Sequence, residues 1–99
     1  MILSIFKIRG TSLAPEYLDG DFVLASRLAI WFRHLRIGDV VVFIQPGYGT
    51  LIKRVAELTP CGHLMVQGDE ASSVDSRAFG PVRTSDVRGR VLWHIKRRG

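Results

Sequence analysis

The sequence predicts a mainly β protein, in which short strands form one coiled, antiparallel and barrel-like sheet. Runs rich in β-branched and aromatic residues recur along the chain, and turn-forming residues separate them. Only one stretch, residues 27–36, has a pattern compatible with a helix. The 99 residues, 46% of them hydrophobic, suffice for one modest core, so we expect a single domain over residues 1–99.

The first three expected strands lie in the N-terminal half. Residues 5–9, IFKIR, alternate between apolar and polar side chains, and the opening MILSIF joins this strand because it lacks the features of a secretory signal. DFVLAS at 21–26 and DVVVFI at 39–44 are rich in branched and aromatic residues. Each of these two runs begins at the aspartate of a Gly-Asp pair, which is typical of a turn that leads into a strand.

Three further strands are expected in the C-terminal half. TLIKRVAEL at 50–58 follows the turn PGYG, and HLMVQ at 63–67 follows TPCG. GRVLWHIKR at 89–97 alternates in hydrophobicity. Side chains two residues apart share a face of a strand, so the expected apolar face of this last run carries Val91, Trp93 and Ile95.

The chain is basic, with a formal net charge of +5. Its basic residues are scattered among acidic ones except at the C-terminal HIKRRG, and no nucleic-acid recognition motif is visible, so we expect no specific nucleic-acid partner. Trp31 and Phe32 stand beside basic residues, a combination that allows peripheral contact with anionic lipid headgroups, although both aromatics also fit a core or half-exposed strand position.

Cysteine content and hydropathy indicate where the protein can work. Cys61 is the only cysteine, so the fold does not depend on an intramolecular disulfide and a reducing compartment is allowed. No apolar run reaches the ~18 to 20 residues that span a bilayer. We expect a monomer that is cytoplasmic or peripheral to the membrane, without a transmembrane anchor in this chain.

Two residues far apart in the chain could form a catalytic pair. Ser12 lies in the turn-like RGTSLAP, where a serine is either ordinary loop chemistry or a nucleophile. Lys53 lies in the expected strand at 50–58, and a lysine can activate a serine only when burial disfavours its ammonium form. Alternation does not decide whether Lys53 or Arg54 is buried, and it leaves open that Lys53 is a solvated strand residue.

Other candidate sites are weaker. Cys61 and His63 form a Cys-Gly-His sequence without the additional ligands that a metal site needs, and the acidic residues around Asp69 lack the spacing of a calcium loop. We therefore expect neither a metal nor a cofactor.

Several blocks, in this order and spacing, resemble the signal peptidase I family of Ser/Lys serine peptidases over nearly the whole chain. These blocks are RGTSLAP, LDGDFVLAS, RIGDVVVF, LIKRV, QGDEASSVDSRAFGPV and GRVLWHI. The resemblance implies the coiled β fold that this family shares with LexA-type repressors. In its small size the chain is similar to soluble maturation peptidases of the kind that process nickel superoxide dismutase.

The resemblance also implies a site. The family's nucleophile falls on Ser12, its general base on Lys53, and the hydroxyl that orients the lysine on Ser73. The oxyanion and substrate pocket would include Gly10, Thr11, Leu13 and Pro15. Residues that support the site would be Gly68, Asp69, Asp75, Ser76 and Arg77, with an ion pair between Asp75 and Arg77. Some relatives carry a hydroxyl at the position of Gly10, so here the oxyanion would depend on backbone donors such as the N–H of Ser12.

The implied activity is that of a serine endopeptidase, which removes an N-terminal signal or leader peptide from a partner polypeptide through an acyl-enzyme. Small side chains would be preferred at the first and third positions before the cut. Two alternatives stay open: a LexA-like autoproteolytic switch domain, and a catalytically decayed binding domain on the same fold.

Overall fold

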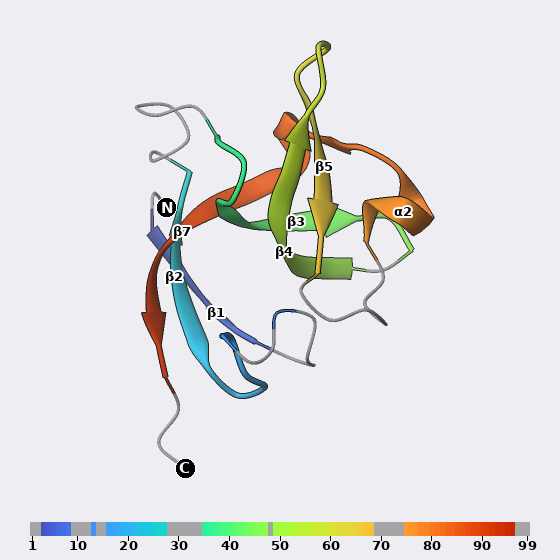
Figure 1. Ribbon diagram of the computed structural model, residues 1–99. Coiled ribbons are helices and arrows are strands. Elements are labelled where there is room, and N and C mark those ends of the chain that lie inside the picture. Colours follow the sequence, from blue (N-terminus) through green and yellow to red (C-terminus); the bar gives the residue numbers. More distant parts are fainter. Residues whose placement is uncertain are drawn as a thin grey trace.

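The computed structural model describes residues 3–8, 13, 16–27, 35–47, 49–68 and 75–96. Within these ranges the chain consists mainly of strands, with one short α-helix and one 3-10 turn (Figure 1). The elements are β1 (Leu3–Lys7), β2 (Phe22–Ser26), β3 (Val40–Gln45), β4 (Gly49–Leu58), β5 (His63–Gln67), α2 (Ser76–Phe79), β6 (Val82–Arg83), η1 (Thr84–Asp86) and β7 (Val87–Ile95).

The strands form one sheet in the order β1-β2-β7-β3-β4-β5-β6, and every neighbouring pair is antiparallel. The C-terminal part of β7 pairs with β2 and its N-terminal part pairs with β3, so this long strand joins two halves of the sheet. Figure 1 shows the halves turned relative to each other, with β1 and β2 on one side of the molecule and β4 and β5 on the other. The prediction of a mainly β, coiled antiparallel fold is confirmed.

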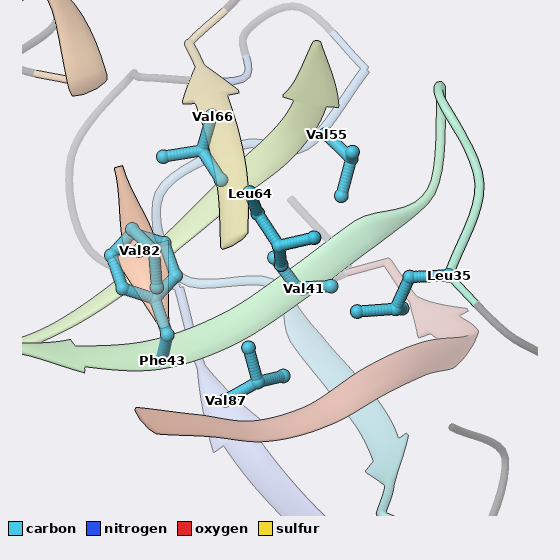
Figure 2. Packing of buried hydrophobic residues seen from close by; sticks show 8 residues of the cluster. All are labelled: Leu35, Val41, Phe43, Val55, Leu64, Val66, Val82 and Val87. Atoms are coloured by element: carbon cyan, nitrogen blue, oxygen red, sulfur yellow. The ribbon is translucent and has the colours of Figure 1, made fainter. Parts of the chain in front are cut away.

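The central strand, β3, is buried on both of its faces. Val41 and Phe43 belong to one apolar cluster, which Figure 2 shows in close-up, whereas Val40 and Val42 belong to a second cluster on the opposite face. A strand covered on both sides needs apolar residues at every position rather than at alternate ones. This arrangement explains why residues 40–44, VVVFI, are a continuous apolar run.

The expectation that Val91, Trp93 and Ile95 lie on one face of the strand is wrong. The register between β2 and β7 shifts, because Leu24 pairs with Trp93 whereas Ala25 pairs with Val91. This bulge adds one residue to β7, and one extra residue turns the following side chains to the other face of the sheet. Val91 therefore packs against the second core cluster, whereas Trp93 is 67% exposed.

The helical content also differs from expectation. Of the expected helix, residues 28–34 lie outside the described residues, and the described ends of that stretch are not helical. The short helix α2 was not anticipated, because a single turn has too few residues to show a helical period. The carboxylate of Asp75 caps α2 by accepting a hydrogen bond from the backbone N–H of Arg77, and Phe79 packs against Phe43, with ring centroids 6.1 Å apart. In the part of the chain that the structure covers, no helix has the length and apolarity to cross a bilayer.

Candidate active site

Lys53 is a buried lysine in the middle of β4. Its residue is only 4% exposed, and its cross-strand partner on β3 is the fully buried Val41. Leu51 and Val55 precede and follow it on the same face of β4, and Val41 and Val55 belong to the apolar cluster of Figure 2. Arg54 points to the other face and is partly exposed. The structure thus decides between the two neighbours that alternation could not separate.

Burial lowers the pKa of Lys53 below its ordinary value of 10.5. The largest cause is desolvation, which penalises the ammonium form in an apolar environment. The negative charge of Asp75 opposes this effect, and the positive charge of Arg77 reinforces it. Of the described carboxylates, none lies within ion-pair distance of Lys53. At moderate pH the neutral form therefore makes up a larger fraction of the Lys53 amine than of the amine of an exposed lysine.

Asp75 is a second buried ionisable group, which is 1% exposed. Its carboxylate accepts hydrogen bonds from the backbone N–H groups of Gly68 at 3.2 Å and Arg77 at 3.0 Å. The Arg77 guanidinium donates two more, from Nε at 2.9 Å and Nη2 at 2.8 Å. The side-chain hydrogen bond from Arg77 is the main reason that the pKa of Asp75 falls to about 2. The ion pair expected between Asp75 and Arg77 is present.

Ser76 connects this turn to the sheet. Its residue is buried, and its Oγ accepts a hydrogen bond of 2.8 Å from the backbone N–H of Val66 on β5. Val66 in turn pairs with Val55 on β4, two residues after Lys53. The residues from Asp75 to Arg77 are therefore fixed both to β5 and, through it, to the strand that carries Lys53.

The segment that follows Ser12 in the chain is held by contacts on both sides. Leu13 is 1% exposed in the second core cluster, and its carbonyl accepts a hydrogen bond from the N–H of Tyr17 at 3.0 Å. Glu16 forms an ion pair of 2.8 Å with Arg54 Nη2, while Arg54 Nη1 donates to the carbonyl of Gly38 at 3.2 Å. Arg54 thereby connects this segment to β4 at the position next to Lys53.

A partly buried pair formed by His94 and Asp21 was not predicted from the sequence. His94 Nε2 lies 2.7 Å from Asp21 Oδ2, and its ring stacks on Tyr17 with centroids 4.3 Å apart. The same Asp21 oxygen accepts a hydrogen bond from the N–H of Leu18. His94 and Asp21 are 73 positions apart in the chain, so no local pattern could indicate the contact.

Several predicted site residues cannot be placed. The expected nucleophile, the hydroxyl that orients the lysine and most of the expected pocket residues lie outside the described residues, as do the two aromatics considered for membrane contact. These are Ser12, Ser73, Gly10, Thr11, Pro15, Asp69, Trp31 and Phe32. Among the predicted residues that are described, hydrogen bonds to Asp75 bring Gly68 and Arg77 together, and the neighbouring Ser76 is hydrogen-bonded to Val66 on β5.

A cavity of about 260 Å³ lies between β1 and the first half of β4. Its walls are mainly apolar and come from four strands: Phe6, Lys7, Ile8, Val23, Val42, Thr50, Leu51 and Ile52. Within the described chain β1 pairs with β2 alone, so β1 is an edge strand beside this cavity. The sequence analysis did not predict this cavity, because only the coiling of the sheet brings β1 next to β4.

Comparisons with known proteins agree with this architecture. The family model described as "Signal peptidase, peptidase S26" matches residues 1–60. The mitochondrial ATP-independent inner membrane protease subunit 1a of Arabidopsis thaliana is 32% identical over 119 residues, covering 95% of this chain and 71% of that protein. The mitochondrial inner membrane protease subunit 1 of Homo sapiens is 29% identical over 108 residues, covering 87% and 65%.

The mitochondrial ATP-independent inner membrane protease subunit 1b of Arabidopsis thaliana is 51% identical over a shorter stretch of 39 residues, which covers 38% of this chain and 23% of that protein. The chain spans about two thirds of the length of the first two relatives, 71% and 65%. The resemblance drawn from the sequence blocks is confirmed: this chain belongs to the signal peptidase family of peptidases, family S26.

Proposed function

We propose that this chain is a serine endopeptidase, in which Ser12 is the nucleophile and Lys53 the general base, and that it removes an N-terminal leader from a partner polypeptide. The observation that carries the proposal is the buried Lys53, whose pKa is lowered by desolvation. This lysine lies in a chain that belongs to a peptidase family. A catalytically decayed binding domain gains nothing from a buried amine, because burying a lysine costs stability.

The proposed reaction has two stages. Neutral Lys53 takes the proton of the Ser12 hydroxyl as Oγ attacks the scissile carbonyl, and backbone N–H groups hold the oxyanion. The Lys53 ammonium then gives its proton to the leaving amine as the C–N bond breaks. Water, deprotonated by Lys53, attacks the resulting ester, which releases the leader with a free carboxylate and restores the Ser12 hydroxyl.

The remaining site residues have supporting roles in this proposal. Ser73 would accept a hydrogen bond from the Lys53 amine and aim it at Ser12. Asp75, two residues later, is fixed by hydrogen bonds from Gly68 and Arg77, which gives the segment that carries Ser73 a rigid anchor. Gly10, Thr11, Leu13 and Pro15 would shape the pocket around the nucleophile, and Asp69 would extend the support that begins at Gly68.

The cavity beside β1 provides a place for the leader. An extended peptide can add to an edge strand through main-chain hydrogen bonds, while alternate side chains enter pockets. The leader precedes the cut, so it would run back from Ser12 alongside β1, parallel to that strand. The apolar walls of the cavity then favour an apolar side chain at the third position before the cut.

The exposed face of β1, β2 and β7, which we call the outer face, suits peripheral contact with a membrane. Its apolar residues are Leu3, Ile5, Phe22, Trp93 and Ile95, each at least 39% exposed. The basic Lys7 shares this face, since it pairs with Phe22, and the chain carries a net charge of +5. A Trp-containing apolar surface beside cations fits a bilayer with anionic headgroups, and the relatives are named as inner membrane proteases.

The catalytic proposal is tested with a panel of leader peptides ending in Ala-x-Ala, followed by mass spectrometry of the products. We expect the wild-type protein to cleave after the last alanine and Ser12→Ala to lose the activity. Equal cleavage by both proteins would assign the reaction to another group. Cleavage of the chain itself, instead of the added peptides, would favour the alternative of a LexA-like autoproteolytic switch.

The membrane proposal is tested by sedimentation with vesicles that contain an anionic phospholipid. Ile5→Glu should weaken vesicle binding about tenfold or more, because it places a charge where about 1.5 to 3 kcal/mol of apolar burial is expected. Ile37→Glu is the matched control, since Ile37 is similarly exposed, at 68% against 64%, and lies outside the outer face. An equal loss in both variants, or none in Ile5→Glu, would contradict membrane contact through this face.

A further inference from the structure

A second pocket, which we call the arginine pocket, adjoins the apolar cavity. It has a volume of about 420 Å³ and is lined by Ser4, Phe6, Arg27, Thr50 and Arg88. Phe6 and Thr50 line both the arginine pocket and the apolar cavity. The two pockets therefore adjoin each other, and we call them together the cleft: one part is mainly apolar and the other is lined by two arginines.

The arginines of this pocket have no ion-pair partner among the described residues. Neither Arg27 nor Arg88 has a carboxylate within ion-pair distance in the described ranges, and both residues are exposed. Arg54 and Arg77, by contrast, each form an ion pair of 2.8 Å. Two guanidinium groups in one pocket repel each other, and a bound anion relieves that repulsion. Arginine is also well suited to a carboxylate, which it can bind with two parallel hydrogen bonds.

The position of the pocket along β1 indicates which part of a leader would reach it. Ser4 and Phe6 lie on the same face of β1, two residues apart, which corresponds to about 7 Å along the strand. Phe6 and Ile8 line the apolar cavity, and the chain then continues toward Ser12. A leader that lies parallel to β1 therefore passes the apolar cavity next to the cut and the arginine pocket farther upstream.

We propose that Arg27 and Arg88 bind an acidic side chain of the leader, two residues upstream of the residue in the apolar cavity. If the third residue before the cut fills that cavity, the acidic residue is the fifth, because side chains two apart face the same way in an extended peptide. This inference rests on the proposed function and adds a charge preference to it. Ser4 and Phe6 face the cleft, opposite to Leu3 and Ile5 on the outer face, so a peptide suits the pocket better than a lipid headgroup.

The test uses three leader peptides that differ only at the fifth position before the cut, which is Glu, Gln or Lys. Wild-type protein should show kcat/KM values in the order Glu, Gln, Lys, with about a 3- to 10-fold drop at each step and the change mainly in KM. Raising the salt concentration should reduce the differences. In the double variant Arg27→Glu and Arg88→Glu, the order should reverse.

A control variant and a binding measurement make the outcome decisive. Arg83→Glu changes charge at an exposed arginine of β6 that does not line the cleft, and it should keep the wild-type order. Fluorescence polarisation with Ser12→Ala measures the same three affinities without cleavage, so the charge preference can be assessed even if the catalytic proposal fails. Equal affinity for the three peptides, or an equal effect of Arg83→Glu, would overturn the proposal. The double variant could also lose binding to anionic vesicles while it keeps the wild-type preference among the peptides. That result would overturn the proposal and would assign the two arginines to a lipid headgroup.

Discussion

Replacing Lys53 by methionine is expected to lower leader cleavage about 10²- to 10⁴-fold, the range typical for the loss of a general acid and base. Methionine has a similar length and suits the apolar surroundings formed by Val41, Leu51 and Val55. The variant should therefore fold and bind leader peptides with wild-type affinity. The measurement is kcat and KM for wild type and Lys53→Met on the same leader peptide.

The same substitution should raise the free energy of unfolding at neutral pH, since it removes a buried ionisable group. The pKa of Lys53 is lower in the folded protein than its ordinary 10.5, so between these two values the unfolded chain binds more protons. The free energy of unfolding of the wild type should therefore rise with pH between these two pKa values. Lys53→Met lacks the titrating amine and should not show this rise. Cleavage by the wild type should rise over the same window, because the base must be neutral.

Lys96→Met, at an exposed lysine, is the control for the loss of one positive charge. It should leave the cleavage rate unchanged. If Lys53→Met kept the wild-type rate, or if it lowered the free energy of unfolding while the Lys96 control did not, Lys53 would be a structural residue and not the base.

Replacing Asp75 by alanine is expected to have the largest effect on stability, about 2 to 4 kcal/mol. The substitution removes the cap of α2 and leaves the buried N–H of Gly68 without its acceptor, and each loss typically costs about 1 to 2 kcal/mol. Urea denaturation of wild type and Asp75→Ala measures the difference. Glu57→Ala, at an exposed carboxylate of β4, is the control and should cost less than about 0.5 kcal/mol.

The contribution of Asp75 should depend on pH with a defined sign. Its pKa is about 2 in the folded protein against an ordinary 3.8, so the stabilisation is complete above 3.8 and disappears as the pH falls toward 2. The Asp75→Asn variant should also shift the pH–rate profile to lower pH, because the carboxylate is the charge that raises the pKa of Lys53. An unchanged profile would show that Asp75 does not act on Lys53.

The sequence predicted the order of the strands along the chain. It predicted only in part which side chains of each strand face the core. Alternation and turn residues located β2 to β5 to within one residue. Alternation failed in β7, because the bulge opposite Leu24 and Ala25 depends on pairing with another strand. Alternation between apolar and polar residues was also uninformative for β3, because one apolar cluster covers each of its two faces.

The candidate site shows the same division between local and long-range information. Asp75 and Arg77 lie two residues apart in one sequence block, and the resemblance carried by that block implied their ion pair, but not the helix that Asp75 caps. The choice between Lys53 and Arg54 needed the partner strands, because only the packing of Val41 against β4 shows which side chain is desolvated. His94 with Asp21, and Arg27 with Arg88, are brought together by the coiling of the sheet and have no local signature.

The most direct measurement is an NMR titration of the lysine side chains in protein labelled with ¹³C and ¹⁵N at lysine, with Lys53→Met used to assign the Lys53 signal. We predict that Lys53 titrates below its ordinary pKa of 10.5, because burial disfavours its ammonium form. If Lys53 titrated at 10.5 or above, the amine would be protonated at neutral pH, and the proposed role of Lys53 as the base would be contradicted.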